Sequence, residues 1–133
     1  MNEVKNMKHR LFLILFVVLL LTGCVSTDKD VTYKQITISE AVEMMASESD
    51  YIILDVRRPD EFATGHIPNA INIPNESIGT DEISELPDKD QLILVYCRSG
   101  NRSKQASQKL VKLGYSNVVE FGGINDWKGE IEK

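Results

Sequence analysis

A cysteine followed closely by two arginines is the strongest chemical signal in this chain. The stretch reads Cys97, Arg98, Ser99, Gly100, Asn101 and Arg102. An apolar run typical of a buried strand precedes it at residues 91–96, and a helical pattern follows over residues 103–113. The thiol is therefore expected where a strand ends and a helix begins.

This position suits a nucleophile that works beside an anion. Backbone N–H groups at a helix start lack partners and carry partial positive charge, which favours the thiolate form of a nearby cysteine. Arg98 and Arg102 add permanent charge and forked donors that suit an oxyanion. Ser99 and Gly100 are small, so the backbone can curl close to a ligand. The stretch predicts an anion-binding loop around a nucleophilic Cys97.

Composition limits the function classes. The chain has 133 residues and 42% apolar content, enough for one folded domain with a core. Its net charge of -5 argues against nucleic acid as a partner. Two cysteines and two histidines without paired spacing make no credible metal site, and no glycine-rich phosphate motif is present, so we expect no metal and no cofactor.

The amino-terminal segment resembles a bacterial lipoprotein signal. Basic residues precede an uncharged apolar run over residues 11–21, which is shorter than the roughly 20 residues that span a bilayer. The run ends in Leu21-Thr22-Gly23-Cys24, which is similar to a lipobox. We expect residues 1–23 to be a cleaved signal peptide, Cys24 to carry the lipid, residues 24–32 to form a tether and residues 33–133 to form the domain. The protein would then be anchored to a membrane on the extracytoplasmic face of the cell envelope.

Strand and helix patterns alternate along the rest of the chain. We expect strands at residues 34–38, 51–54, 70–74, 92–96 and 118–121. Helices are expected after Ser39, from Pro59 to a stop at Gly65, over residues 80–86, and from residue 103 to a stop at Gly114. The first helix would bury Ala41, Val42, Met44 and Met45. This alternation predicts an α/β fold with a mostly parallel sheet of about five strands flanked by helices.

The carboxyl ends of two strands should form the site. Ligands bind beyond the carboxyl ends of strands in such sheets. Cys97 and Asp55 both stand there. Every arginine after residue 10 also falls at these ends: Arg57, Arg58, Arg98 and Arg102.

Two stretches of the chain resemble the rhodanese family. Residues 54–70, Leu-Asp-Val-Arg-Arg-Pro-Asp-Glu-Phe-Ala-Thr-Gly-His-Ile-Pro-Asn-Ala, are similar to a family signature, and residues 97–102 are similar to its active-site loop. Gly122-Gly123 with Trp127 is a weaker third match. The resemblance covers residues 36–128 and implies a rhodanese-like fold.

The resemblance also implies a reaction. In a sulfurtransferase of this family a cysteine takes the outer sulfur of a donor such as thiosulfate, becomes a persulfide, and passes the sulfur to cyanide, a small thiol or a protein thiol. Carried over, Cys97 is the sulfur carrier, and N–H groups of residues 98–102 cradle the persulfide. Arg98 and Arg102 attract the donor, while Asp55, Arg57 and, with less support, Arg58 hold the loop. Asp55 and Glu61 could instead form ion pairs that only hold the fold, and His66 is expected to be a structural turn residue.

Two alternatives stay open. A cysteine phosphatase or arsenate reductase also places a cysteine before a helix, but with five residues before the arginine, whereas four separate Cys97 from Arg102. Tyr96 also stands where many phosphatases have a histidine. A non-catalytic binding or persulfide-relay module would share the same residues.

Overall fold

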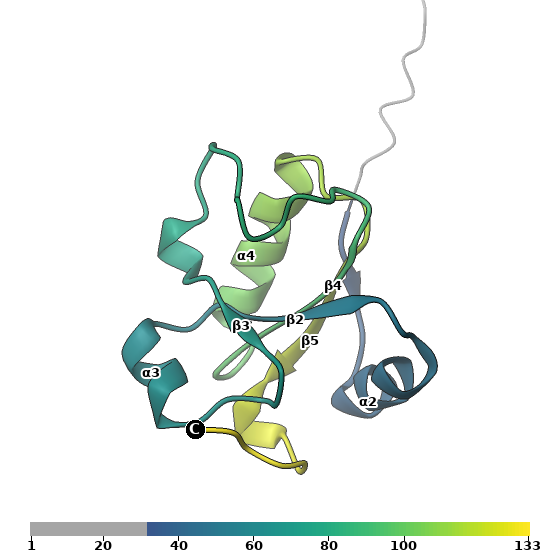
Figure 1. The fold of residues 1–133 in the computed structure, drawn as a ribbon, viewed down its shortest axis with the longest axis vertical. Coiled ribbons are helices and arrows are strands. Elements are labelled where there is room, and N and C mark those ends of the chain that lie inside the picture. The colour runs from purple at the N-terminus through teal and green to yellow at the C-terminus, as the bar shows by residue number, and fades with distance from the viewer. Residues whose placement is uncertain (1–31) are drawn as a thin grey trace, which may run out of the picture.

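Five parallel strands form one sheet in the computed structural model, which describes residues 32–133 (Figure 1). Their spatial order is β1 (Lys34–Gln35), β5 (Val118–Gly123), β4 (Leu92–Cys97), β2 (Tyr51–Asp55) and β3 (Ile71–Asn72). The parallel α/β prediction is therefore confirmed. The predicted signal peptide, Cys24 and nearly all of the tether lie outside the described residues. Within residues 32–133, no helix combines the length and the apolar character needed to cross a bilayer.

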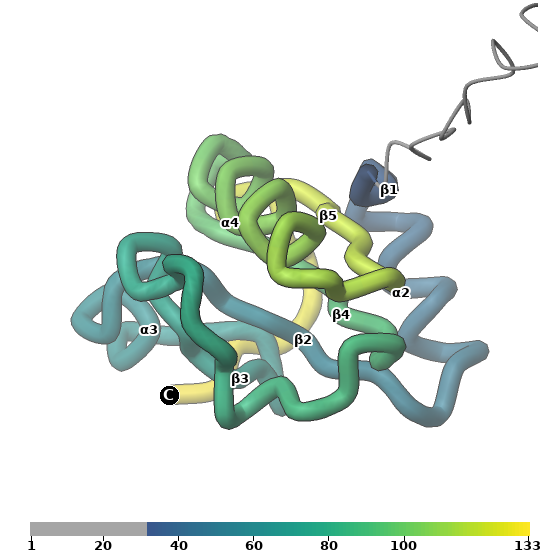
Figure 2. The backbone as a smooth tube through the Cα atoms, turned by 90° about the horizontal axis from the view of Figure 1, so that it is seen from above, coloured from purple at the N-terminus to yellow at the C-terminus, as the bar shows by residue number. Residues whose placement is uncertain are grey.

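Both faces of the sheet are covered, as the end-on view in Figure 2 shows. One core cluster joins the sheet to α4 (Asn101–Lys112), and the other joins it to α2 (Ile38–Ser47). Successive strand residues point to opposite faces. In β4, Ile93, Val95 and Cys97 belong to the α4 side, and Leu94 and Tyr96 belong to the α2 side. The sheet thus delivers the thiol toward α4.

The first strand and helix differ from the prediction. β1 stops at Gln35, and α2 begins at Ile38 because Thr37, not Ser39, is its N-cap. The Thr37 hydroxyl accepts the Glu40 N–H at 3.2 Å, and the Glu40 carboxylate accepts the Thr37 N–H at 2.7 Å. This reciprocal capping box fixes the helix start.

The predicted apolar face of α2 was partly wrong. Ala41 is fully buried, and Met44 and Met45 pack at the edge of the core. Val42 is 47% exposed, because it lies on the solvent side of the helix.

The structure differs from the prediction at two further places within residues 70–90. β3 covers only Ile71–Asn72, because Pro74 cannot donate to a strand ladder. No helix forms over residues 80–86; a 3-10 turn at Asn75–Ser77 precedes an irregular segment instead. This segment places Ile78, Ile83 and Leu86 in or against the α4-side core, so tertiary burial overrides a weak local preference.

The ends of two helices and of the last strand lie close to their predicted positions. α3 (Pro59–Thr64) follows β2 and ends at Gly65, as predicted (Figure 1). α4 ends just before Gly114, whose φ of 93° is the left-handed stop that we expect. β5 runs two residues past the predicted end and passes into a 3-10 turn at Ile124–Asp126.

Candidate active site

The loop after β4 curls around the thiol. β4 ends at Cys97, and α4 begins at Asn101, so only Arg98, Ser99 and Gly100 form the turn between them. Gly100 has a φ of 108°, a conformation that favours glycine. Its N–H donates to Cys97 Sγ at 3.0 Å. The expected backbone donor beside the sulfur is therefore in place.

The helix starts two residues earlier than the pattern predicted. Asn101 and Arg102 belong to the first turn of α4 rather than to the loop. The Lys104 N–H bonds to the Gly100 carbonyl at 3.3 Å, which makes the N–H groups before it first-turn amides without helical acceptors. The positive end of α4 thus begins directly beside the sulfur.

Gly123 of β5 allows the loop to lie against the sheet. A Cβ on Gly123 would lie 2.2 Å from the Arg98 carbonyl oxygen, so no side chain fits there. The same oxygen accepts the Asn125 N–H at 3.2 Å. The β4–β5 pairing shifts register between Val95 and Cys97 at this point. Within the weak Gly122-Gly123 match, Gly123 therefore marks a close contact between β5 and the backbone of the loop.

A buried polar pair lies under the thiol and was not predicted. The Ser103 hydroxyl lies 3.4 Å from Cys97 Sγ and donates to Glu120 Oε1 at 2.6 Å. Ser103 and Glu120 are both buried. The only sequence signal for Glu120 is its charge inside the apolar run of residues 118–121.

Arg102 is held by a carboxylate rather than left open to solvent. Its guanidinium donates to both oxygens of Glu61, at 2.6 and 3.0 Å, and so joins α4 to α3. The Arg102 hydrogen bonds lower the pKa of Glu61 to about 2, against the opposing effect of burial. Glu61 also accepts the Arg58 N–H at 3.1 Å. Arg98 is exposed on the loop.

Asp55 and Arg57 form a buried pair at the end of β2. The guanidinium reaches both carboxylate oxygens, with a shortest distance of 2.7 Å, and donates to the Gly65 carbonyl at 2.7 Å. Burial opposes the charged form of Arg57, but hydrogen bonds to Asp55 outweigh it and raise the Arg57 pKa. Burial, followed by the Asp55 carboxylate, raises the pKa of Tyr96. The pair braces the strand end beside the loop.

Arg58 and His66 bond to residues outside the Cys97 loop. Arg58 is exposed and pairs with Asp60 at 3.0 Å. His66 stacks on Phe62 with ring centroids 3.7 Å apart, and its backbone pairs with Glu132 near the carboxyl terminus. Its Nδ1 lies 3.0 Å from the Phe62 carbonyl oxygen. These contacts match the structural turn role expected for His66.

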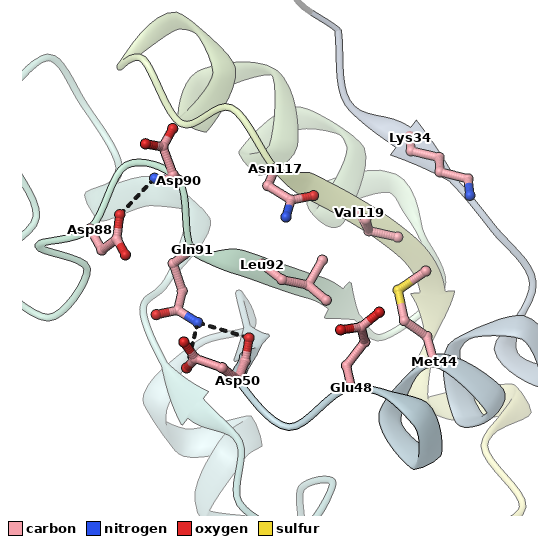
Figure 3. Close-up of a pocket in the computed structure, with 10 residues that line it drawn as sticks. All are labelled: Lys34, Met44, Glu48, Asp50, Asp88, Asp90, Gln91, Leu92, Asn117 and Val119. Carbon is pink, nitrogen blue, oxygen red and sulfur yellow. Dashed lines mark hydrogen bonds between the residues drawn. The ribbon is translucent and has the colours of Figure 1, made fainter.

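A hollow of about 350 Å³ lies at the opposite edge of the sheet (Figure 3). It is lined by residues around the amino ends of the strands, including Lys34, Leu92 and Asn117. Asp50 receives two hydrogen bonds from the Gln91 amide there, at 3.0 Å each. This hollow is therefore separate from the Cys97 loop, which lies at the carboxyl ends.

The fold, the cysteine loop and the paired strand ends define one family. The model of the rhodanese-like domain matches residues 37–130, and the chain belongs to that family. Thiosulfate sulfurtransferase GlpE from Coxiella burnetii is 38% identical over 97 residues, which cover 72% of this chain and 88% of that protein. A solved rhodanese-related protein from Thermoplasma volcanium matches with a TM-score of 0.63 and 33% identity, over 75% of this chain and 98% of that one.

A longer relative matches only in part. Adenylyltransferase and sulfurtransferase uba4 from Ogataea parapolymorpha is 33% identical over 110 residues, which are 82% of this chain but only 28% of that protein. The likeness to named sulfurtransferases supports a sulfur-transfer function at the level of the family.

Proposed function

We propose that this protein is a sulfurtransferase that moves a sulfane sulfur from a donor such as thiosulfate to a thiophilic acceptor through a Cys97 persulfide. The observation that carries the proposal is the N–H of Gly100 donating to Cys97 Sγ at 3.0 Å, beside the start of α4. A sulfur anion at this point receives a backbone donor and the positive end of a helix.

The two half-reactions need no resident cofactor. The Cys97 thiolate attacks the outer sulfur of thiosulfate, an S–S bond forms to Cys97, and sulfite leaves with the electron pair of the broken bond. The resulting persulfide is cleaved by cyanide, which leaves as thiocyanate and restores the thiolate. A small thiol or a protein thiol could take the place of cyanide.

The burial of the thiol favours transfer of a single atom. Cys97 is 1% exposed, so a donor must present its terminal sulfur end-on within the loop. Arg98 and the first-turn amides of α4 would attract the anionic end of the donor. The turn of three residues between β4 and α4 leaves little room for a phosphoryl group, which supports sulfur transfer over phosphatase or arsenate reductase chemistry.

Peptide mass spectrometry tests the proposal directly. The full chain in detergent, treated with thiosulfate, should gain the mass of one sulfur atom on the peptide that contains Cys97. Cyanide should remove that mass and release thiocyanate, with ping-pong kinetics. Cys97→Ser, which is nearly isosteric, should abolish both steps, and Cys24→Ser should serve as the matched control that retains them.

Two other outcomes would replace the proposal. Hydrolysis of aryl phosphates through Cys97, without any gain of sulfur, would establish the phosphatase alternative. If no small donor loads Cys97 but a persulfidated protein does, a relay module is the better account.

We also propose that the domain is tethered outside the cytoplasm by a lipid on Cys24. The support is the sequence alone, a basic start and an apolar run that end in Leu21-Thr22-Gly23-Cys24. A free Cys97 suits this location because Cys24, once acylated, offers it no disulfide partner.

A further inference from the structure

A chain of hydrogen bonds links the thiol to a buried carboxylate. Cys97 Sγ lies 3.4 Å from the Ser103 hydroxyl, and that hydroxyl lies 2.6 Å from Glu120 Oε1. Cys97 and Glu120 are 1% and 3% exposed, and Ser103 is fully buried. The proposed sulfur-transfer steps make no use of this carboxylate.

Glu120 occupies a position where an apolar residue is expected. Its neighbours Val119 and Phe121 pack into the α2-side core, so Glu120 points to the α4 side, as Cys97 does. Burying a carboxylate is costly unless it is hydrogen-bonded. Oε1 accepts from Ser103 and also from the Gly122 N–H at 2.9 Å, so the group is held in place toward the thiol.

Cys97, Ser103 and Glu120 can hold their protons in two arrangements. Ser103 has one hydroxyl proton. When that proton points to the Glu120 carboxylate, the Ser103 oxygen can accept only from a protonated Cys97. When Cys97 is a thiolate, the single Ser103 proton can bond to the sulfur or to Glu120 but not to both, although each keeps a backbone donor, the Gly100 and the Gly122 N–H respectively. A proton on Glu120 leaves the Ser103 proton free for the sulfur. Two backbone carbonyls are also within reach of the Ser103 hydroxyl, that of Gly100 at 2.9 Å and that of Gly122 at 3.4 Å.

We propose that Glu120, acting through Ser103, takes up the proton that leaves Cys97 and returns it when the sulfur has been passed on. This role rests on the proposed sulfur transfer. Before attack, the Cys97 proton moves to the Ser103 oxygen, while the Ser103 proton moves to Glu120 Oε1. After the acceptor removes the outer sulfur, the reverse shift restores the thiol and the carboxylate. The proton balance is kept within the protein, and no oxidant or reductant is required.

Cys97 and Glu120 are the two groups that share the proton, because the charged side chains near them are either paired with one another or exposed. Ser103 of α4 and Cys97 of β4 face Glu120, and β1 places the uncharged Gln35 beside it in register. The charges around the thiol are Arg102, neutralised by Glu61 of α3, and the exposed Arg98. The Asp55–Arg57 pair is closed on itself at the end of β2.

The pH profile of Cys97 alkylation tests the proposal without any sulfur donor. Iodoacetamide reacts with the thiolate, and the modified peptide is counted by mass spectrometry in the full chain. In the wild type, a fraction of Cys97 should remain a thiolate in acid, because the shared proton can reside on Glu120. The alkylation rate should therefore level off at a plateau as the pH falls below the midpoint of its main rise. In Glu120→Gln the rate should fall about tenfold for each pH unit below its midpoint, as for an isolated acid.

Three variants separate the proton role from a structural one. Ser103→Ala should lose the plateau although Glu120 remains, and Glu120→Asp should restore part of it. Glu43→Gln, on the exposed surface of α2, is the matched control and should keep the wild-type profile. Profiles of the same shape in the wild type and in Glu120→Gln would overturn the proposal. Because alkylation needs no sulfur transfer, this result is independent of whether thiosulfate is the donor.

A measurement on the wild type alone covers the case in which the variants do not fold. Infrared difference spectra between the persulfidated and the reduced protein should show the carbonyl band of a newly protonated carboxylic acid. Absence of that band in a fully persulfidated sample would also overturn the proposal.

Discussion

The Arg102 guanidinium donates two hydrogen bonds to the Glu61 carboxylate, at 2.6 and 3.0 Å, and so connects the first turn of α4 to α3. The sequence predicts that Arg102 faces the donor. Its pairing instead makes Arg98 the exposed cation on the loop and makes Glu61 the residue that positions Arg102. This relationship separates two effects that one arginine could otherwise combine, donor attraction and support of the loop.

Replacing Arg98 and Arg102 by alanine should reduce thiosulfate use by different routes. A charge-assisted hydrogen bond to a partly buried anion contributes about 1.5–3 kcal/mol, so Arg98→Ala should lower kcat/KM for thiosulfate roughly tenfold or more. Arg102→Ala should lower it too, and should also destabilise the fold because Glu61 loses its partner. Steady-state kinetics with urea unfolding of each variant measures both effects.

Glu61→Gln gives the matching control for Arg102. It should free the guanidinium, so thiosulfate use should be kept or improved while stability falls. Unchanged kinetics in both alanine variants would show that neither arginine serves the donor.

Stability should fall in acid as Glu61 is protonated. Its pKa is lowered from 4.5 to about 2 in the folded protein, chiefly by Arg102, so its stabilising effect is present above pH 4.5 and is lost as the pH falls toward 2. The contribution is at most about 3 kcal/mol. Urea unfolding from pH 6 to pH 2 should show a smaller loss in Glu61→Gln than in the wild type. Equal losses would mean that the pair contributes nothing to folding.

Adding one methyl group at Gly123 should displace the reactive loop. A Cβ there would meet the Arg98 carbonyl oxygen at 2.2 Å, and that oxygen belongs to the backbone and cannot rotate away. Gly123→Ala should cost on the order of 1–3 kcal/mol and reduce persulfide formation. Gly79→Ala, where nothing lies within 4 Å, should be nearly neutral. Thermal unfolding and the Cys97 mass assay compare the two, and equal effects would contradict the backbone contact.

Removing one member of the buried Asp55–Arg57 pair should be costly. Asp55→Ala leaves a buried guanidinium without its carboxylate, which typically destabilises a protein by about 3–5 kcal/mol. Arg58→Ala is the control, because Arg58 is exposed and its ion pair with Asp60 is screened by solvent. Denaturant unfolding measures both. Similar small losses would show that the buried pair is dispensable.

Cys24→Ser should block lipid attachment and leave an uncleaved precursor. Metabolic labelling with a fatty acid, followed by electrophoresis, should show label on the wild type and on Cys97→Ser but not on Cys24→Ser. Label that persists on Cys24→Ser would sink the lipid-anchor proposal.

Sequence patterns were sufficient for the parts of the fold that depend on local chemistry. The strand before Cys97 and the strand at residues 51–54 are continuous apolar runs, and Pro59 and Gly65 bracket α3. The position of Cys97 at a strand end before a helix could therefore be predicted.

Features that depend on long-range contacts could not be predicted. The pairing of Glu61 with Arg102 joins residues 41 positions apart, and Ser103 meets Glu120 across 17 positions. The path of residues 80–86 is set by which apolar side chains reach the α4-side core, and not by their local helix preference. No periodicity in the sequence contains this information.

The position of β5 in the sheet has a consequence for the order of folding. It is the last strand in the sequence, yet it lies between β1 and β4, and β1 pairs with no other strand of the sheet. Its Gly123 also lies directly against the Arg98 backbone. A chain growing from its amino terminus therefore cannot complete the sheet, or the backbone contact that supports the loop, until β5 has been made. Contacts of such high sequence separation slow folding, so the Arg98 backbone reaches its place against Gly123 only late in assembly.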